Sequence, residues 1–539
     1  MDDYTKIEPR IEKIVQSLEK ENEQPPRSNA ANQTIEVIDF VRKSGAVLFH
    51  DELGDGYIAP SGDGTEVFRI RSNSKAFRRW LAYQSHKKFG KPLHTNVMTE
   101  ATSALEGYAI HEGTMYQLSV RVAFYENQIW YDLGKSAVKI DAKRWEIVPN
   151  PPIIFRRFNS QKKQIEPQRG GNLDLLDTHL PRSMKEGQRL IFKISLVTGL
   201  IPYIPQTVDA VFGEHGSAKS TAVKVKKDLL DPSEIDEFTP PDNVREFTQA
   251  LYHHWYLPMG NLTKLPQWMS DCICRASTGS GFSKRELYTD DDDVIYKFIR
   301  VVGLNGINLV AEKSDLLDRI ILVGELKRIP EEERMEDAVF WESFRIDKPL
   351  ILGAMFDALS GAIREYDGIK IPRMPRMADF TRWGCAVAKS LGSSYETSFL
   401  IAYRENIAMQ HHEAIEASPI GTTIMLFMEA RESWEGTPSE LLEALQDIAA
   451  SLKLDKDKRF PKNPSWLWRR INEIRVNLQE KGIKCEKDKE TDRLIRITKT
   501  GENAVSGVHD AQSVSVSQDS SDSNQDSIIP DMNFADALI

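Results

Sequence analysis

Stretches with strand-like and helix-like apolar patterns follow one another along the N-terminal part of the chain. Residues 47–50 and 117–124 carry short apolar or alternating runs, which are typical of strands, whereas 75–89 has the spacing of an amphipathic helix. Short turns separate these runs. The pattern predicts an α+β domain over residues 35–157.

Changes in periodicity and composition divide the rest of the chain. The last forty residues are rich in Ser and Asp and contain no Lys or Arg, so we expect them to be disordered. Together the patterns predict a multidomain α/β protein. The expected segments are a charged N-terminal segment and linker (1–34), the α+β domain (35–157), a basic linker (158–172), a phosphate-binding-loop domain (173–368), a helical region (369–448), a basic module (449–499) and an acidic tail (500–539).

The most informative motif lies between an apolar run, 208–212, and a segment with a helical pattern, 221–230. It reads GEHGSAKST, which is a strand, a glycine-bearing turn and Lys-Ser-Thr before a helix. Such a loop wraps backbone N–H groups around a polyphosphate, while the helix points its positive end at the same charge. We therefore expect ATP and Mg²⁺, with Lys219 reaching the β- and γ-phosphates and the Ser220 hydroxyl on the metal. The predicted nucleotide-binding residues are Gly213, Gly216, Ser217, Ala218, Lys219, Ser220 and Thr221.

The motif departs from the usual G-x-x-x-x-G-K-[ST] at one position. Ala218 stands where the second glycine is expected, and Gly216 supplies another flexible point. The alternative is a chance glycine turn before a basic helix. We favour the phosphate-binding loop because strand, loop and helix follow in the required order.

Two residues downstream of the loop fit the chemistry of an ATPase. Asn305 ends an apolar strand, and an Asn at a strand tip can orient the attacking water. Arg319 precedes another apolar strand and can act as an arginine finger in a neighbouring subunit's site. The alternatives are a strand-capping Asn and an Arg in a surface ion pair. The order of the two after a phosphate-binding loop favours catalytic roles for Asn305 and Arg319.

These motifs carry a family resemblance. Gly213 to Ser220 resembles the loop of minichromosome-maintenance (MCM) helicases, and residues 317–319, Leu-Asp-Arg, resemble their arginine-finger segment. The run 265–290, LPQWMSDCICRASTGSGFSKRELYTD, resembles MCM-related AAA+ ATPases of mobile elements and prophages, which often accompany primase domains. The resemblance implies an AAA+ domain with a helical lid, and a helicase-like hexameric ring that moves on DNA. It also implies Asn305 as the sensor-1 residue.

One departure from the family bears on hydrolysis. The resemblance places Asp-Asn, the Walker B pair, just before Leu265-Pro-Gln-Trp, but this chain has Met259-Gly260-Asn261. Gly260 has no carboxylate to organise Mg²⁺ or the lytic water. Two hypotheses therefore stay open. The chain is a DNA-dependent ATPase, or it is an ATP-gated DNA-binding and assembly protein with little or no turnover.

The stretch 373–384 is the second distinctive one, RMPRMADFTRWG. Arg373 or Arg376 is a candidate sensor-2 arginine, which touches the γ-phosphate from a helical lid. The alternative is the start of a helix with surface arginines, since Pro375 and Asp379 suit a helix N-terminus.

The basic module predicts a winged helix. Residues 456–499 contain 14 Lys and Arg against 7 Asp and Glu, and they show an amphipathic basic helix followed by a hairpin. The alternative is a winged fold used only for protein contacts. The candidate DNA-phosphate contacts are Arg469, Arg470, Arg475, Arg493 and Arg496.

Overall composition limits the partners. The 539 residues carry a net charge of −10, so DNA must bind to local patches rather than to the whole surface. The four cysteines lack zinc-site spacing and are expected as reduced, partly buried thiols. No apolar run approaches the roughly 18 residues of a membrane span, and the N-terminus lacks a signal peptide's apolar core. We expect a cytoplasmic protein with no membrane contact that binds DNA and copies of itself, with a primase or another replication protein as a further candidate partner. The acidic C-terminus is either a docking peptide or a frayed end.

Overall fold

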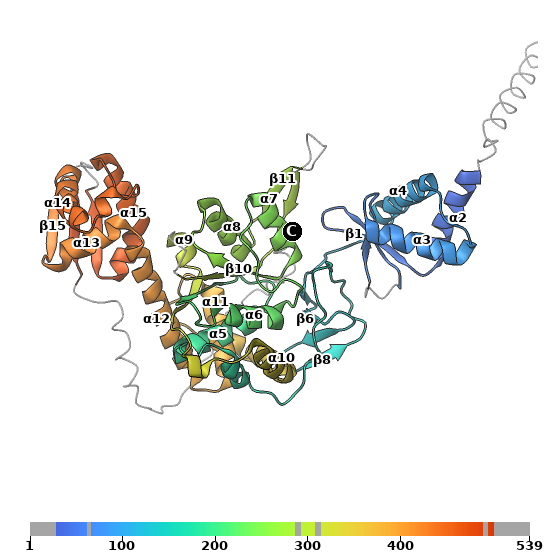
Figure 1. Ribbon diagram of the computed structural model, residues 1–539, viewed down its shortest axis with the longest axis horizontal. Coiled ribbons are helices and arrows are strands. Elements are labelled where there is room, and N and C mark those ends of the chain that lie inside the picture. Colours follow the sequence, from blue (N-terminus) through green and yellow to red (C-terminus); the bar gives the residue numbers. More distant parts are fainter. Residues whose placement is uncertain (1–28, 62–65, 286–292, 308–313, 489–493, 501–539) are drawn as a thin grey trace, which may run out of the picture.

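The computed structural model describes residues 29–61, 66–285, 293–307, 314–488 and 494–500. Figure 1 shows a small N-terminal unit and a small C-terminal unit on opposite sides of a larger central one. All but the first residue of the predicted acidic tail and most of the N-terminal charged segment lie outside the described residues. The multidomain α/β organisation expected from sequence is confirmed at this level.

The N-terminal unit is a four-stranded sheet with helices packed against it. Its sheet order is β3-β2-β1-β4, in which β1 and β4 are parallel and the other pairs antiparallel. Ser74 caps α3 through the Phe77 amide, and Gly90 ends the helix in the left-handed conformation. The elements are α2 (Asn29–Lys43), β1 (Val47–Asp51), β2 (Gly56–Ala59), β3 (Phe68–Arg69), α3 (Lys75–Phe89), α4 (Thr95–His111) and β4 (Thr114–Tyr116).

An antiparallel meander follows, and it belongs to the central unit. Its strands are β5 (Val122–Tyr125), β6 (Gln128–Asp132), β7 (Ala137–Ile140) and β8 (Trp145–Val148), in sequence order. Tyr131 and Trp145 pack on Phe356, and the Trp145 indole donates to Asp357 at 2.8 Å. The region predicted as one domain over 35–157 therefore contains two sheets with separate cores, because the aromatic side chains of the second sheet bury against a helix roughly 200 residues away in the sequence.

A parallel sheet forms the centre of the molecule, in the order β10-β13-β9-β14. The strands are β9 (Val208–Gly213), β10 (Tyr256–Leu262), β13 (Val301–Gly306) and β14 (Ile320–Leu326). Parallel strands need crossovers, and helices supply them here. The other elements of this unit are η1 (Leu173–His179), α5 (Glu186–Thr198), α6 (Lys219–Leu230), α7 (Val244–His253), α8 (Gln267–Thr278), β11 (Phe282–Arg285), β12 (Asp293–Tyr296), α9 (Ser314–Leu317), η2 (Glu331–Glu333), α10 (Asp337–Glu365) and η3 (Tyr366–Gly368).

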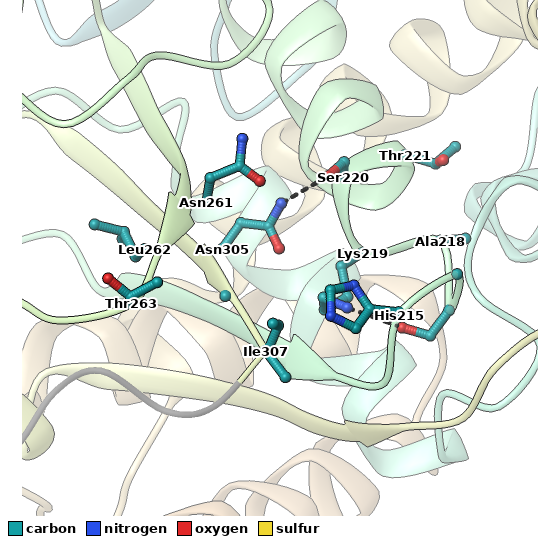
Figure 2. Close-up of a pocket in the computed structure, with 13 residues that line it drawn as sticks. His215, Ala218, Lys219, Ser220, Thr221, Asn261, Leu262, Thr263, Asn305 and Ile307 are labelled. Carbon is teal, nitrogen blue, oxygen red and sulfur yellow. Dashed lines mark hydrogen bonds between the residues drawn. The ribbon is translucent and has the colours of Figure 1, made fainter.

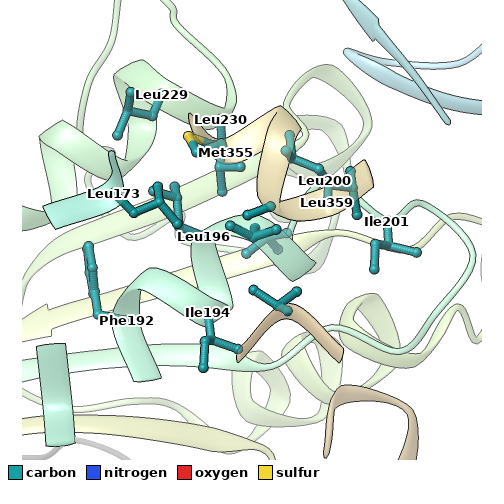
Figure 3. Close-up of a cluster of buried hydrophobic side chains, with 14 of the residues drawn as sticks. Leu173, Phe192, Ile194, Leu196, Leu200, Ile201, Leu229, Leu230, Met355 and Leu359 are labelled. Carbon is teal, nitrogen blue, oxygen red and sulfur yellow. The ribbon is translucent and has the colours of Figure 1, made fainter. Parts of the chain in front are cut away.

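Both faces of this sheet are buried, which is why its strands read as continuous apolar runs. Val211 of β9 joins the core formed with α5, α6 and α10, whereas its neighbours Val208 and Ala210 join the core formed with α7 and α8. Figure 3 shows the first core, in which leucines of α5 and of the end of α6 meet Met355 and Leu359 of α10. The two cores hold the carboxyl ends of the strands in register.

Buried ion pairs tie the meander to the helix that follows the phosphate-binding loop. The Asp231 carboxylate accepts hydrogen bonds from Arg121 at 3.1 Å and from Lys227 at 2.7 Å, and all three side chains are almost wholly buried. Burial alone raises the pKa of Asp231, but Lys227, His254 and Arg121 outweigh it and hold that pKa well below its usual value. A second buried pair joins Lys226 to Asp209 of β9.

Two long helices lead to the C-terminal unit, α11 (Ala378–Leu391) and α12 (Tyr395–Glu416). That unit has one core, and its sheet order is β15-β17-β16. Its elements are α13 (Pro419–Glu429), β15 (Ser433–Gly436), α14 (Pro438–Ser451), η4 (Leu454–Lys456), α15 (Pro464–Glu480), β16 (Ile483–Lys487) and β17 (Ile495–Lys499). The core thus draws on elements before residue 449, the boundary expected from sequence, because β15 pairs with a strand that comes much later in the chain.

All four cysteines, Cys272, Cys274, Cys385 and Cys485, are buried free thiols. Burial raises the pKa of the Cys385 and Cys485 thiols to about 12, so both are protonated at neutral pH. In the part of the chain that the structure describes, no helix combines the length and the apolar character needed to cross a bilayer.

Candidate nucleotide site

The phosphate-binding motif forms a tight loop between β9 and α6. Gly213 has φ of 149°, and a Cβ there would meet the Leu326 carbonyl oxygen at 2.4 Å, so only glycine fits. Gly216 and Ala218 both take left-handed backbone conformations, with φ of 73° and 63°. Ala218 therefore adopts the conformation for which the usual motif has glycine, at a cost of roughly 1–2 kcal/mol.

Lys219, the first residue of α6, turns its ammonium back over the loop. Its Nζ donates to the carbonyl oxygens of Gly213 at 2.9 Å and Glu214 at 2.5 Å. Partial burial lowers the pKa of Lys219 from its ordinary value. The first amides of α6 have no helical partner and carry the positive end of the helix dipole. Cation and amides together favour an anion at this loop.

A cavity of about 400 Å³ opens beside the loop, within the size range of small-molecule sites. The loop, the end of β10 and the end of β13 line it (Figure 2). The lining residues are His215, Gly216, Ser217, Ala218, Lys219, Ser220, Thr221, Asn261, Leu262, Thr263, Asn305, Gly306 and Ile307. All but one of the loop residues expected from sequence line this cavity, the exception being Gly213, whose carbonyl holds Lys219.

Asn305 lies at the carboxyl end of β13, directly opposite the loop. Its Nδ2 donates to Ser220 Oγ at 2.8 Å and to Glu237 Oε1 at 2.6 Å, and the side chain is 3 % exposed. Its Oδ1 is buried without a hydrogen-bond partner. A buried amide oxygen without a partner is uncommon in folded proteins, and Asn305 is one of the residues that line the cavity.

Gly260 lies on β10, the neighbour of β13. A Cβ built there would meet the Glu237 carboxyl carbon at 2.2 Å and Oε1 at 2.4 Å. Glu237 comes from the connection between α6 and α7, where Phe238 bridges Met259 in parallel fashion. The Glu237 carboxyl group therefore lies directly beside Gly260 of β10. Sequence reasoning missed Glu237, because nothing in a loop acid's local pattern indicates which strand it will approach.

The three arginines predicted to act on ATP, Arg319 in a neighbouring subunit's site and Arg373 or Arg376 at the γ-phosphate, lie outside this cavity. Arg319 and Arg376 both bond to Asp315, and Arg376 also bonds to Asp318. Arg373 is exposed. None of the three lines the cavity. The two acids of α9 and the turn after it hold Arg319 and Arg376 together, so the structure gathers them into one group away from their own chain's loop.

The arginines of the C-terminal unit differ in their partners. Arg470 is paired with Glu473 on its own helix, and Arg496 with Glu435 on the adjacent strand. Arg469 and Arg475 are exposed on α15, with Arg469 over the Trp466 ring. Arg493 lies outside the described residues. Of the described candidates, the two exposed arginines outside these ion pairs, Arg469 and Arg475, therefore both lie on α15.

Two other acidic residues of a type that can bind metals form ion pairs instead. The Asp51 carboxylate pairs with Arg156 at 2.6 Å, and that of Asp132 with Arg157 at 2.8 Å. Across the described ranges, no group of three His, Cys, Asp or Glu side chains is arranged to hold a metal.

Comparison with known proteins identifies the family of most of the central and C-terminal units. Residues 182–409 match the model described as Actinomycete integrative conjugative element replication protein, and residues 420–514 match the AICE RepA C-terminal domain. The two matches together span more than half of the 539 residues. The expectation of a replication protein from a mobile element is confirmed. The finer assignment to MCM-related AAA+ proteins stays a prediction.

Two solved structures show distant likeness. The A form apo structure of the NrS-1 C-terminal region has 11% identity and a TM-score of 0.41, with 86% of this chain and 99% of that chain covered. A crystal structure of JCV helicase with a bound small molecule has 13% identity and a TM-score of 0.21, over 44% and 70% of the two chains. Such low TM-scores support no conclusion about this chain. No curated protein matches it in sequence.

Proposed function

We propose that this chain, a member of the replication-protein family of actinomycete integrative conjugative elements, is an ATP-dependent DNA motor of the AAA+ class. The observation that carries the proposal is the convergence of Lys219, Ser220 and Asn305 on one cavity at the carboxyl ends of parallel strands. Ligands of open α/β sheets bind at that edge.

The residues of this cavity fit ATP with Mg²⁺. Lys219 and the first amides of α6 bind the phosphate oxygens, and the Ser220 hydroxyl is an oxygen ligand of the kind that Mg²⁺ takes. The buried Asn305 Oδ1 is a fixed acceptor that can orient a water. Mg²⁺, when bound with ATP, neutralises charge that develops on the phosphates during hydrolysis.

The second part of the proposal is a ring, in which Arg319 and Arg376 serve the neighbouring subunit's nucleotide. Both are tethered to Asp315 and neither reaches its own cavity. A guanidinium acting across an interface must lie away from its own phosphate-binding loop, and this pair does. The shared tether keeps two positive charges together until a phosphate replaces the carboxylates.

The third part is DNA binding by the C-terminal unit as a winged helix. Its elements run helix, strand, helix, helix, strand, strand from α13 to β17, which supports this assignment. In such modules the last helix enters the major groove, and α15 carries the exposed Arg469 and Arg475. A primase encoded alongside this protein is a further partner that we propose from the family resemblance.

ATP hydrolysis by the full chain, with and without single-stranded DNA, tests the motor. We expect DNA to stimulate turnover, and Lys219→Ala and Arg319→Ala each to abolish it. Because the arginine acts across the interface, mixing the two inactive variants restores activity at about a quarter of the interfaces of a random ring. Turnover that persists in Lys219→Ala contradicts the proposal.

ATP binding without turnover favours the second hypothesis, an ATP-gated DNA-binding and assembly protein. The observation behind it is that β10 presents Gly260 where the resemblance to MCM-related ATPases places a carboxylate. In that case nucleotide stabilises the assembly, and its release rather than its hydrolysis resets the protein.

A further inference from the structure

We propose that Glu237 supplies the carboxylate of the nucleotide site that β10 lacks, so that the acid reaches the Mg²⁺ position from a neighbouring segment rather than from the strand itself. This inference rests on the proposed ATP site. Glu237 lies outside the motifs found in the sequence, and its carboxylate would supply the acid that Gly260 cannot.

The Glu237 carboxyl group occupies space next to position 260 of β10. A Cβ at position 260 would lie 2.2 Å from the carboxyl carbon of Glu237 and 2.7 Å from its Cγ. Real side chains do not approach so closely, so the Glu237 carboxyl group occupies the space that a side chain at 260 would fill. Glycine at 260 therefore leaves room for the Glu237 carboxylate, which a side chain at 260 would displace from its present position.

Hydrogen bonds fix the backbone of the segment that carries Glu237 on both sides of this residue. The Phe238 amide donates to the Pro258 carbonyl at 2.9 Å, and the Gly260 amide donates to the Phe238 carbonyl at 3.0 Å. Both bonds use the backbone of Phe238, so they fix the residue next to Glu237 at the edge of the sheet beside β10. Further back, the Glu234 amide donates to the Ser160 carbonyl at 2.8 Å. The backbone on both sides of Glu237 is therefore held by hydrogen bonds, at Glu234 and at Phe238.

Asn305 connects Glu237 to the phosphate-binding loop. One amide nitrogen, Asn305 Nδ2, donates to both the Glu237 carboxylate at 2.6 Å and the Ser220 hydroxyl at 2.8 Å. The carboxylate and the hydroxyl therefore share one donor, and Ser220 and Asn305 both line the cavity beside the loop. A hydroxyl and one carboxylate are a donor set that Mg²⁺ accepts while it keeps several waters.

The test uses the full chain and a fluorescent ATP analogue, with affinity measured at several free Mg²⁺ concentrations and in EDTA. Mg²⁺ should strengthen binding to the wild type. Glu237→Gln keeps the shape but removes the charge, and it should lower the Mg²⁺-dependent part of the affinity by roughly 10- to 100-fold. Binding in EDTA should not weaken. The same variant should lose hydrolysis wherever the wild type shows it.

Asp236→Asn is the matched control, since it removes an exposed carboxylate from the adjacent position and should leave the Mg²⁺ response unchanged. A relocation variant, Gly260→Asp with Glu237→Ala, returns the acid to β10 and should recover the Mg²⁺ response. Gly260→Asp alone crowds the native Glu237 and should not improve on the wild type. Recovery in the double variant also excludes misfolding as the cause of the loss in Glu237→Gln.

A wild-type Mg²⁺ response in Glu237→Gln, or a wild-type affinity that does not depend on Mg²⁺, overturns the assignment of Glu237. A different result would show that the ATP site itself is wrongly assigned. In that case Lys219→Ala would bind the analogue in EDTA as tightly as the wild type does.

Discussion

At the scale of single residues, the loop shows how small side chains set the geometry of the site. Gly213 is required by the close approach of Leu326, and Gly216 takes a left-handed backbone conformation that glycine adopts without strain. Ala218 takes the same left-handed conformation with a methyl group present. The strain is held in place by α6 on one side and by β9 on the other.

Ala218→Gly should stabilise the central unit by about 1 kcal/mol, because glycine takes a left-handed conformation without steric cost. Calorimetry of the full chain measures this stabilisation. The unfolding transition of the nucleotide-binding unit is the one whose temperature ATP raises, and the effect of the variant is measured in that transition. Ala222→Gly in α6 is the control. It introduces the same glycine into a regular helix and should destabilise by about 1 kcal/mol or more. Equal effects from both variants would contradict the strain at 218.

At the scale of elements, the site depends on the segment between α6 and α7. Asp231 begins this segment, is wholly buried, and bonds to Arg121, Lys227 and the Trp255 amide. Arg121 belongs to the turn before β5, so the meander, α6 and β10 meet at this one carboxylate. The interaction fixes where the chain leaves α6 and hence where Glu237 reaches the sheet.

Asp231→Asn should destabilise the protein by about 3–5 kcal/mol, because it leaves Arg121 and Lys227 buried with uncompensated charge. Thermal or urea unfolding measures the loss. Glu234→Gln, further along the same segment, removes an acid that pairs with Lys162 at the surface and should cost no more than about 1 kcal/mol. A small effect of Asp231→Asn would show that water or a rearranged partner replaces the buried carboxylate.

Helix α15 is the element on which DNA binding is expected to depend. Removing one arginine that binds a DNA phosphate lowers the slope of log affinity against log salt by about 1, so Arg469→Ala with Arg475→Ala should lower it by about 2. Anisotropy titrations with duplex DNA at several salt concentrations measure this slope. Arg470→Ala should have a smaller effect, because Glu473 already neutralises that guanidinium. An unchanged slope in the double variant would favour a protein-binding role for the unit.

Local sequence pattern predicted what depends on neighbouring residues. The loop and the strand before it follow from glycine spacing and apolar runs, and Asn305 from its place at a strand end. Glu237 and β15 were not predictable in this way. Glu237 acquires its role from the approach of residues 237–238 to β10, and β15 becomes a strand only by pairing with β17. The position of the Arg376 side chain also depends on tertiary interactions, since it pairs with Asp315 and Asp318.

At the scale of the whole molecule, the central sheet lies between two small units with different attachments. The C-terminal unit joins through α12, which packs on β14, α5 and α15, so a movement of the nucleotide site can reach it through one helix. The N-terminal unit has its own cores, formed by α2, α3, α4 and the sheet beside them. We propose that ATP, bound at the centre, controls how the C-terminal unit holds DNA.

Equilibrium binding of ATP to the purified chain, compared with Lys219→Ala, tests the central claim most directly. Lys224→Ala, further along the same helix, serves as the charge-matched control. We predict Mg²⁺-dependent binding in the wild type and in Lys224→Ala, and none in Lys219→Ala, because only Lys219 turns its cation into the loop. Undiminished affinity in Lys219→Ala would contradict the nucleotide site and, with it, the motor.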